Sequence, residues 1–426
     1  MSEFDKIIGY ETIKNELKQV CDMIQNKEVY ENLGAKLPHG ILLYGDPGLG
    51  KTLMAKCFID ESGLNAYTVR RNKGSDGFIE EITETFKKAK ENSPAIIFLD
   101  DIDKFANEDE NHRDAEEYVA VQAGIDEAQG SDVFVLATAN KIYKLPFSLI
   151  RSGRFDRKVK VCCPTAKDAG EIIRHYLKGK KVSDDVNIED ITMMISYSSC
   201  AELETILNEA AISAAFARHD SISMEDLTNA VLRMQYEATE SYTKSSEEDL
   251  RKAALHEAGH LVVCEVLCPG SVGLASLRKS SQDATGGFIH RCKELKRRAY
   301  HILVCLAGKA AVELYYSETC ASGCNFDINC AFQEIRTAIS ESGTCGFGMI
   351  DVSTNRFPRT SENMNSRNEA VVHAELERYM LKARDILLKN RTFLEKATEL
   401  LLKKETLLYS DIKALRESVT IVEVAV

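Results

Sequence analysis

The 426-residue sequence lacks any run of about 18 or more apolar residues, the least that a membrane-spanning helix needs. Its richest apolar stretch, residues 261–277, is interrupted by a glutamate, a proline and two glycines. The first residues are polar and amphipathic, unlike a secretory leader. These absences predict a cytoplasmic chain with no membrane segment of its own.

The chain also lacks an excess of positive charge, because 66 acidic side chains outnumber 54 basic ones and the net charge is −12. Nucleic-acid-binding domains carry basic patches, so the composition gives no support for a nucleic-acid partner. Internal repeats and low-complexity tracts are absent as well. Hydrophobic residues make up 44% of the chain, and this share with this length indicates two or three globular domains.

The 13 cysteines are an odd number, scattered without a secretory signal. This distribution predicts reduced thiols rather than a disulfide framework. Cys320, Cys324, Cys330 and Cys345 lie near one another in the sequence, but their spacing matches no metal-binding pattern. We interpret them as buried or incidental thiols.

Residues 40–162 alternate short apolar runs with helical stretches. The runs are 40–44, 95–99 and 133–137. Each is continuously apolar, which favours parallel strands buried on both faces by the helices that connect them. This part of the chain is therefore predicted to be an α/β domain.

The rest of the chain is predicted to be mainly helical. Residues 165–236 repeat apolar positions at helical spacing, and residues 237–249 are polar and rich in serine, as in a linker. Ser245 with Glu248 forms a candidate capping box at the start of the next helix. That helix is expected to run to about Cys268, where a Pro-Gly pair stops it.

One motif fits the phosphate-binding pattern G-x-x-x-x-G-K-[ST] and lies between an apolar run and a predicted helix, the context that this motif requires. Glycines in such a loop let backbone N–H groups surround phosphates, and the helix N-terminus favours an anion. Lys51 is expected to reach the β- and γ-phosphates of ATP, and Thr52 to hold Mg²⁺. The motif comprises Gly45, Asp46, Pro47, Gly48, Leu49, Gly50, Lys51 and Thr52.

The apolar run at 95–99 ends in two carboxylates, Asp100 and Asp101. Taken alone, this pattern also fits a strand capped by solvated acids. Downstream of a phosphate-binding loop it predicts that Asp100 binds Mg²⁺ and that Asp101 polarises the water that attacks ATP.

His256-Glu257-Ala258-Gly259-His260 fits H-E-x-x-H on a predicted helix. Residues four apart lie on one face of a helix, so the two imidazoles can bind one Zn²⁺ while Glu257 takes a proton from water. The alternative is two unrelated surface histidines. The extended pattern with a third histidine fails, because Val263 and Val266 occupy the places it requires.

Together these motifs resemble those of AAA+ ATPases and, within them, the FtsH-type metalloproteases, and the resemblance covers nearly the whole chain. Residues 137–140 resemble the strand-end sensor, which implies that Asn140 faces the γ-phosphate and water. Residues 151–157 resemble the arginine-finger segment, which implies that Arg154 and Arg157 reach the nucleotide of a neighbouring subunit.

The chain departs from the family pattern at two places in its ATPase half. Asp101 stands where the family has a glutamate, one methylene longer. The stretch that matches the substrate-gripping pore loop, residues 70–77, contains no aromatic side chain, and Phe78 follows it.

The resemblance also implies a third zinc ligand. In the family this ligand is an aspartate in a short glycine-containing loop before a helix, and residues 322–328 offer Asp327 there. Phe326 takes the place of the usual asparagine, Glu313 and Glu318 are the alternative ligands, and a helix cap is the structural interpretation of Asp327. Residues 286–289 resemble the strand beside the cleft, to which a substrate peptide adds as a further strand.

The fold expected from the resemblance is an α/β AAA+ core (1–162), a helical lid (163–236), a linker (237–249) and a mainly helical zincin-type peptidase domain (250–426). The expected function is ATP-dependent endoproteolysis of protein substrates by a homo-hexamer that uses ATP, Mg²⁺ and Zn²⁺. The alternative is a non-proteolytic AAA+ remodelling or assembly ATPase; a nucleic-acid ATPase finds no basic patch.

Overall fold

The computed structural model describes residues 2–71, 75–106, 115–151, 153–238, 246–279, 287–316, 324–339 and 362–424. The chain forms two compact units, each with its own apolar core. The first contains residues 1–179 and 197–207, and the second contains residues 180–196 and 208–426. Within the part of the chain that the structure describes, none of the helices combines the length and the apolarity that a membrane span requires.

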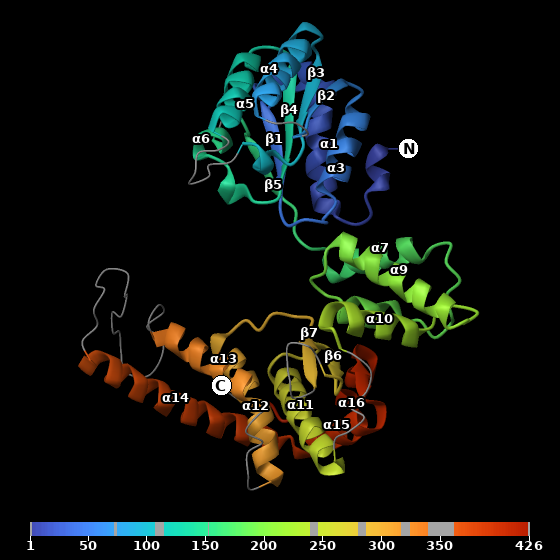
Figure 1. Ribbon diagram of the computed structural model, residues 1–426, viewed down its shortest axis with the longest axis vertical. Helices are drawn as coiled ribbons and strands as arrows, with labels where there is room; N and C mark the ends of the chain where they lie inside the picture. The colour runs from blue at the N-terminus through green and yellow to red at the C-terminus, as the bar shows by residue number, and fades with distance from the viewer. Residues whose placement is uncertain are drawn as a thin grey trace. The chain divides into compact units, whose positions relative to one another are not determined.

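A five-stranded parallel sheet forms the centre of the first unit (Figure 1). Its strands are arranged in the order β2-β3-β4-β1-β5. In chain order they are β1 (Gly40–Tyr44), β2 (Asn65–Val69), β3 (Ala95–Leu99), β4 (Val133–Ala139) and β5 (Arg157–Lys160). The α/β fold predicted from the alternating sequence pattern is confirmed.

The three strands that the sequence predicted are β1, β3 and β4, whose apolar side chains are almost all buried. The two that it missed, β2 and β5, lie at the edges of the sheet. Their sequences, NAYTV and RKVK, leave most positions partly or fully exposed. An edge strand needs no continuous apolar run, so the sequence pattern gave no signal for either one.

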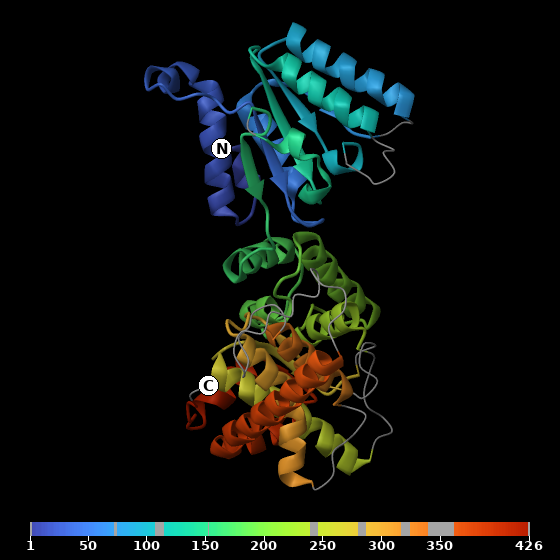
Figure 2. The same cartoon turned by 90° about the vertical axis from the view of Figure 1, so that its left-hand side faces the viewer.

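Helices cover both faces of this sheet (Figure 2). Helices α1 (Glu11–Gln25) and α3 (Lys51–Ser62) lie on one face, and α4 (Ser75–Glu91) and α5 (Ala115–Ala128) lie on the other. This unit also contains α7 (Ala166–Leu177). The short helices are η1 (Glu3–Lys6), α2 (Lys27–Asn32), η2 (Ile102–Lys104), η3 (Ile142–Lys144) and α6 (Phe147–Ile150).

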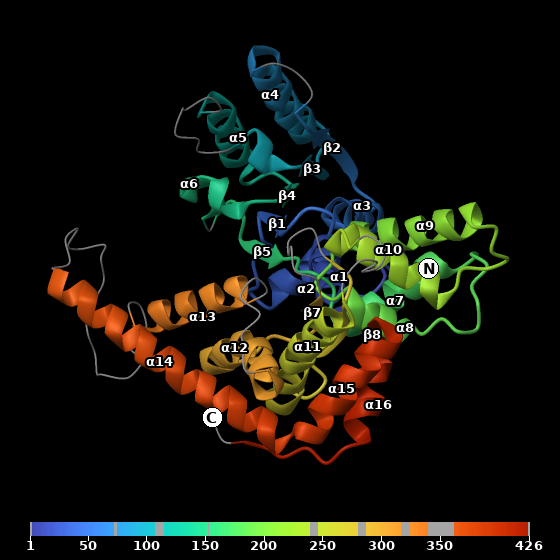
Figure 3. The same ribbon diagram turned by 60° about the horizontal axis from the view of Figure 1, so that its bottom comes forward.

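The second unit begins with separate helices and continues into a larger helical body (Figure 3). The first helices are α8 (Ile188–Met194) and α10 (Met224–Tyr236), while α9 (Cys200–Phe216) contributes residues to both units. The body contains α11 (Glu247–Leu267), α12 (Arg298–Tyr315), α13 (Asn325–Thr337), α14 (Glu362–Lys389), α15 (Arg391–Lys404) and α16 (Tyr409–Glu417). Helix α11 packs on α12 and α15, and α12 packs on α13 and α14.

A three-stranded antiparallel sheet with the order β7-β6-β8 packs beside α11. Its strands are β6 (Val272–Ser276), β7 (Phe288–Arg291) and β8 (Thr406–Leu408). The buried Glu265 carboxylate accepts the backbone N–H groups of Gly270, Ser271 and Val272 at 2.7, 2.9 and 3.0 Å. These bonds form the turn by which α11 passes directly into the central strand β6.

Candidate functional site

The phosphate-binding loop joins β1 to α3, at the carboxyl edge of the parallel sheet. Lys51 is buried there, with 5% of its surface exposed. Its Nζ donates to the carbonyl oxygens of Gly45 at 2.8 Å and Asp46 at 2.7 Å. Burial lowers the pKa of Lys51, and the nearby Asp101 carboxylate opposes this shift. The loop therefore places an ammonium group at a helix N-terminus, an arrangement that suits a phosphate.

The predicted Mg²⁺ ligands meet at the carboxyl end of β3, which is separated from β1 by β4 in the sheet. Thr52 Oγ1 donates to Asp100 Oδ1 at 3.1 Å, and Thr138 Oγ1 on β4 donates to the same oxygen at 2.8 Å. Asp100 is 4% exposed. Since Mg²⁺ binds carboxylate and hydroxyl oxygens near phosphates, the contact between Thr52 and Asp100 fits the predicted site.

The two groups assigned to the attacking water are also in contact. Asn140 Nδ2 donates to Asp101 Oδ1 at 3.1 Å, and Lys104 Nζ donates to Asp101 Oδ2 at 2.6 Å. The backbone N–H of Asn140 donates to Asp103 Oδ1 at 2.9 Å. The strand ends of β3 and β4 therefore bring a carboxylate and an amide together beside the loop.

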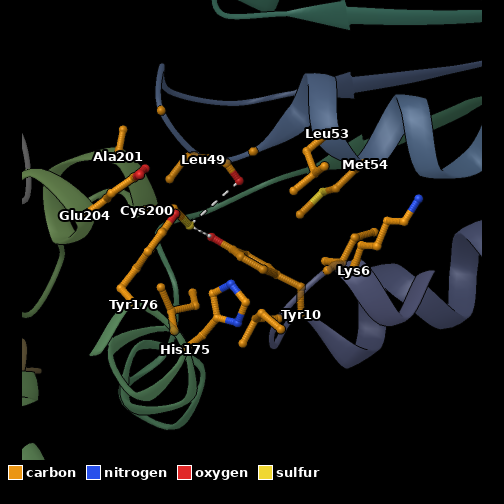
Figure 4. Close-up of a pocket in the computed structure, with 15 residues that line it drawn as sticks. Lys6, Tyr10, Leu49, Leu53, Met54, His175, Tyr176, Cys200, Ala201 and Glu204 are labelled. Atoms are coloured by element: carbon orange, nitrogen blue, oxygen red, sulfur yellow. Dashed lines mark hydrogen bonds between the residues drawn. The ribbon is translucent and has the colours of Figure 1, made fainter. Parts of the chain in front are cut away.

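A cavity of about 330 Å³ opens beside the phosphate-binding loop, lined largely by apolar and aromatic side chains. In Figure 4 Tyr10 reaches from the N-terminal segment toward Cys200 at the start of α9. Its hydroxyl donates to the Cys162 carbonyl at 3.0 Å and lies 3.5 Å from Cys200 Sγ. His175 and Tyr176 of α7 line the same cavity. An apolar pocket with few polar groups next to a phosphate site fits a nucleotide base.

The arginine-finger segment is held within the first unit. Arg154 is 2% exposed, and its Nε and Nη2 donate to the two carboxylate oxygens of Asp126 at 2.8 and 2.7 Å. Its Nη1 donates to the Ser148 carbonyl. Arg157 Nη1 donates to Gln19 Oε1 at 3.1 Å. Arg154 was expected to point toward a neighbouring subunit, but here its side chain is buried within its own chain. Its role as an arginine finger therefore stays a prediction. Ser152 of this segment lies outside the described residues.

The pore-loop stretch falls partly outside the described residues, which omit residues 72–74. Phe78, the nearest aromatic side chain, is fully buried. Its ring packs edge-to-face on the Phe105 ring with 5.2 Å between centroids. Phe78 is therefore a core residue and offers no ring to a substrate.

The H-E-x-x-H motif lies in the middle of α11. Ser245 of the predicted capping box lies outside the described residues, and Ser246 occupies the N-cap instead. Its hydroxyl accepts the backbone N–H of Asp249 at 3.1 Å. The helix ends at Leu267 with Cys268 as its C-cap, as predicted.

Three side chains converge beside α11. His256 Nε2 and His260 Nε2 lie 3.0 Å apart, and Asp327 Oδ2 on the first turn of α13 lies 3.1 and 3.2 Å from them. Ligand atoms around a tetrahedral zinc ion with bonds of about 2.0–2.1 Å are separated by roughly 3.3 Å. The donor set and its spacing therefore fit Zn²⁺. Within the described residues, no other group of three histidine, cysteine or acidic side chains lies this close.

The charges at this cluster are strongly coupled. Burial alone would lower the pKa of His260, but the Asp327 carboxylate, with smaller contributions from Glu257 and the Val304 carbonyl, raises that pKa to about 9. Burial likewise opposes the ionisation of Asp327, yet the two histidines hold its pKa well below the ordinary value. A buried carboxylate facing two imidazoles requires positive charge among them, which a bound cation supplies.

Neighbouring groups orient the two histidines. His260 Nδ1 donates to the Val304 carbonyl at 2.7 Å, so its Nε2 is the nitrogen left for a metal. The Cys324 thiol lies 4.0 Å from His256 Nδ1. Gly308 of α12 lies so close that a Cβ there would come within 2.5 Å of both imidazoles. Neither Val304 nor Gly308 belongs to a recognisable motif, so neither residue could be predicted from the sequence.

Glu257 lies on the same helix and is 4% exposed. The backbone of Gly287, just before β7, packs directly on its carboxylate, because a Cβ at Gly287 would lie 2.6 Å from Glu257 Oε1. Of the alternative ligands, Glu313 bonds Lys309 Nζ at 2.5 Å and is absent from the cluster, while Glu318 lies outside the described residues. Asp327 is the described acid that joins the two histidines.

Comparisons with known proteins match two families, one over each half of the chain. The ATPase family associated with various cellular activities (AAA) matches residues 41–163, and peptidase family M41 matches residues 243–415. The chain is 31% identical to an ATP-dependent zinc metalloprotease FtsH of Leptotrichia buccalis over 88% of this chain and 51% of the relative. It is 32% identical to the FtsH of Streptobacillus moniliformis over 99% of this chain and 65% of that relative.

A third relative, ATP-dependent zinc metalloprotease FtsH 3 of Symbiobacterium thermophilum, is 30% identical over 92% of this chain and 67% of its own length. This chain belongs to the FtsH family. It spans 51% and 65% of the lengths of the first two relatives. The AAA match includes the phosphate-binding loop and both carboxylates that follow β3. The M41 match includes all three residues of the metal cluster.

Proposed function

We propose that the protein is an ATP-dependent zinc metalloendopeptidase that degrades protein substrates. The observation that carries this proposal is the cluster of His256, His260 and Asp327, with Glu257 on the same helix. The FtsH relatives are named for the same activity. Nothing in the comparisons or in the described residues favours the alternative of a non-proteolytic remodelling ATPase.

The peptidase chemistry follows from the residues around the cluster. His256, His260 and Asp327 would hold Zn²⁺, which when bound would supply Lewis acidity toward water and the scissile carbonyl. Glu257 accepts the proton from the attacking water and passes it to the leaving amine nitrogen. The edge of β7 that no described strand covers lies next to Glu257 and offers backbone groups to an extended substrate.

The ATPase chemistry belongs to the first unit. The cavity beside Tyr10 takes the base, Lys51 pairs with the phosphates, and Thr52 with Asp100 holds Mg²⁺. The remaining loop residues, Gly45 to Gly50, offer backbone N–H groups. Asp101 and Asn140 orient the attacking water. These roles rest on the contacts of the strand ends described above.

We further propose that the active form is a homo-hexameric ring in which Arg154 and Arg157 act on the nucleotide of the next subunit. For Arg154 this role requires the guanidinium to leave Asp126, since both groups are paired within one chain here. The division into an AAA+ core (1–162), a lid (163–236), a linker (237–249) and a peptidase domain (250–426) belongs to the same proposal.

Degradation of casein by the zinc-loaded protein tests the proposed function. We expect cleavage that requires ATP and that stops when a chelator removes zinc. Glu257→Gln should keep its zinc and its ATPase activity while cleavage stops, since the ligands remain and the proton acceptor is lost. Retained ATPase activity with no cleavage in the wild-type protein would instead support the remodelling alternative.

A further inference from the structure

Strand β7 is an edge strand with an interrupted ladder. It pairs only with β6 among the described strands, and the register shifts between Val272 and Leu274. A strand of four residues held on one side by such a ladder is weakly fixed by backbone bonds alone. Its position matters because Gly287, the residue before it, packs on the Glu257 carboxylate. Other contacts must therefore hold this strand in place.

Successive side chains of β7 point to opposite faces, as in any strand. On one face, Ile289 packs against the apolar core of the second unit, and Arg291 Nη1 lies 3.3 Å from His301 Nδ1 of α12. Phe288 and His290 therefore face the other way. Their partners come from the residues of the second unit that precede α11.

Two residues cover this other face. The ring of Tyr236, the last residue of α10, stacks on the ring of Phe288 with 4.4 Å between centroids and 28° between planes. Ser196 Oγ lies 2.7 Å from His290 Nε2. The Tyr236 ring also meets the His290 ring edge-on at 6.0 Å. Both alternate side chains of β7 are thus held from the same side.

Helix α8, which ends two residues before Ser196, and helix α10, which ends at Tyr236, make further contacts within the second unit. The Asp190 carboxylate of α8 accepts the backbone N–H and the hydroxyl of Ser410, both at 2.7 Å. Asn229 Oδ1 of α10 accepts from Arg278 Nη1 at 2.8 Å. Tyr236 and Ser196 therefore belong to a fixed support rather than to a loose neighbouring surface.

We propose that Tyr236 and Ser196 are positioning residues for peptide hydrolysis, which hold the edge strand β7 beside Glu257 so that an extended substrate can pair with it. This proposal rests on the proposed proteolytic function. Both residues lie in the segment assigned to the ATPase lid (163–236). The position of β7, and with it substrate pairing, therefore depends on contacts from that segment. The stack places the Tyr236 ring, rather than its hydroxyl, against Phe288, so phenylalanine should replace tyrosine without loss.

The test compares Tyr236→Ala, Tyr236→Phe and Ser196→Ala in the full chain loaded with zinc. Tyr315→Ala is the matched control, because it removes the same ring from the same unit where it packs on Arg391. Hydrogen exchange of the backbone amides of residues 288–291 reports the strand directly. An aromatic pair is worth a factor of about five in such an opening equilibrium. We expect exchange about five-fold faster in Tyr236→Ala and unchanged in Tyr236→Phe and Tyr315→Ala.

Cleavage of a short unstructured fluorogenic peptide gives the second readout. Tyr236→Ala should raise KM about five-fold with little change in kcat, zinc content or ATPase activity, and Tyr236→Phe should behave like the wild type. Unchanged exchange and KM in Tyr236→Ala overturns the proposal, as does equal loss in Tyr236→Phe. If Tyr236→Ala fails to fold, the exchange rate of the His290 amide in Ser196→Ala takes its place. A faster rate than in the wild type supports the proposal, and an unchanged rate overturns it. A wild-type protein that cleaves no peptide refutes the proposed function, while the exchange measurement still decides whether β7 is held.

Discussion

Most polar groups of the nucleotide site come from one eight-residue loop and two neighbouring strand ends, whereas the metal site joins two helices whose ligands, His260 and Asp327, lie 67 residues apart. In the nucleotide site Lys51 and Asp100 already bond to carbonyl and hydroxyl groups of the protein. In the metal site the charged groups face one another. The first arrangement is stable through local hydrogen bonds, and the second depends on the positive charge placed among its ligands.

The largest effect is expected from a substitution beside the metal site that leaves all three ligands in place. Glu257→Gln should lower peptide cleavage by about 10²–10⁴-fold, because the proton acceptor is lost. Zinc content and ATPase activity should match the wild type, as measured by metal analysis and phosphate release. Cleavage near the wild-type rate would remove Glu257 from the mechanism.

Loss of the buried Lys51 ammonium group tests the nucleotide site. Lys51→Ala should lower ATP turnover by about 10²-fold or more, since a charge that stabilises the phosphates is removed. The zinc content should stay unchanged because the two sites share no residue. Turnover and ATP affinity that match the wild type would refute the nucleotide site, and a simultaneous loss of zinc would refute the independence of the two sites.

Removal of Asp327, the metal ligand that is distant in sequence, tests how far the metal site depends on residues outside the H-E-x-x-H motif. Asp327→Ala should weaken zinc binding by about 10²-fold or more, because two histidines alone bind zinc poorly. Glu313→Gln is the control, since Glu313 pairs with Lys309 and lies outside the cluster. Competition with a chromogenic chelator measures both variants. Full zinc affinity in Asp327→Ala together with loss in Glu313→Gln would reverse the assignment.

The smallest effect concerns the pH dependence of stability. Burial, aided by Arg291, lowers the pKa of His290 to about 4 from its ordinary 6.5. Between these values the unfolded chain takes up a proton that the folded chain refuses, so stability is lost as the pH falls through this window. His290 should contribute a loss of about 2 kcal/mol between pH 7 and 4.5. Urea unfolding at the two pH values should show this loss in the wild type and a smaller one in His290→Gln; equal losses would contradict the assignment.

The sequence predicted those parts of the fold whose signal is local. Strands β1, β3 and β4 have continuous apolar runs because they are buried on both faces. The edge strands β2 and β5 have mixed sequences, since one side of each faces solvent. The capping residue of α11 was placed one position too early, because Ser245 and Ser246 both precede an acidic residue at the right spacing.

The same contrast holds for the sites. The phosphate-binding loop and the H-E-x-x-H motif are contiguous, so their residue types and spacing predicted them directly. Asp327 was reached only through the family resemblance, since nothing in its own neighbourhood points to α11. The cavity beside the phosphate-binding loop was not predicted, because its lining comes from separate segments such as those of Tyr10, His175 and Cys200, with no shared motif.

The turn built on Glu265 gives the second unit a rigid corner. One buried carboxylate ties three successive backbone amides, so the helix that carries both histidines and the central strand of the sheet behave as a single piece. The two histidines therefore lie on one continuous piece of the second unit, whereas β7 is joined to that piece through β6 and is held on its other face by Tyr236 and Ser196. Loss of those two contacts would change the path of a bound peptide while the histidines keep their place.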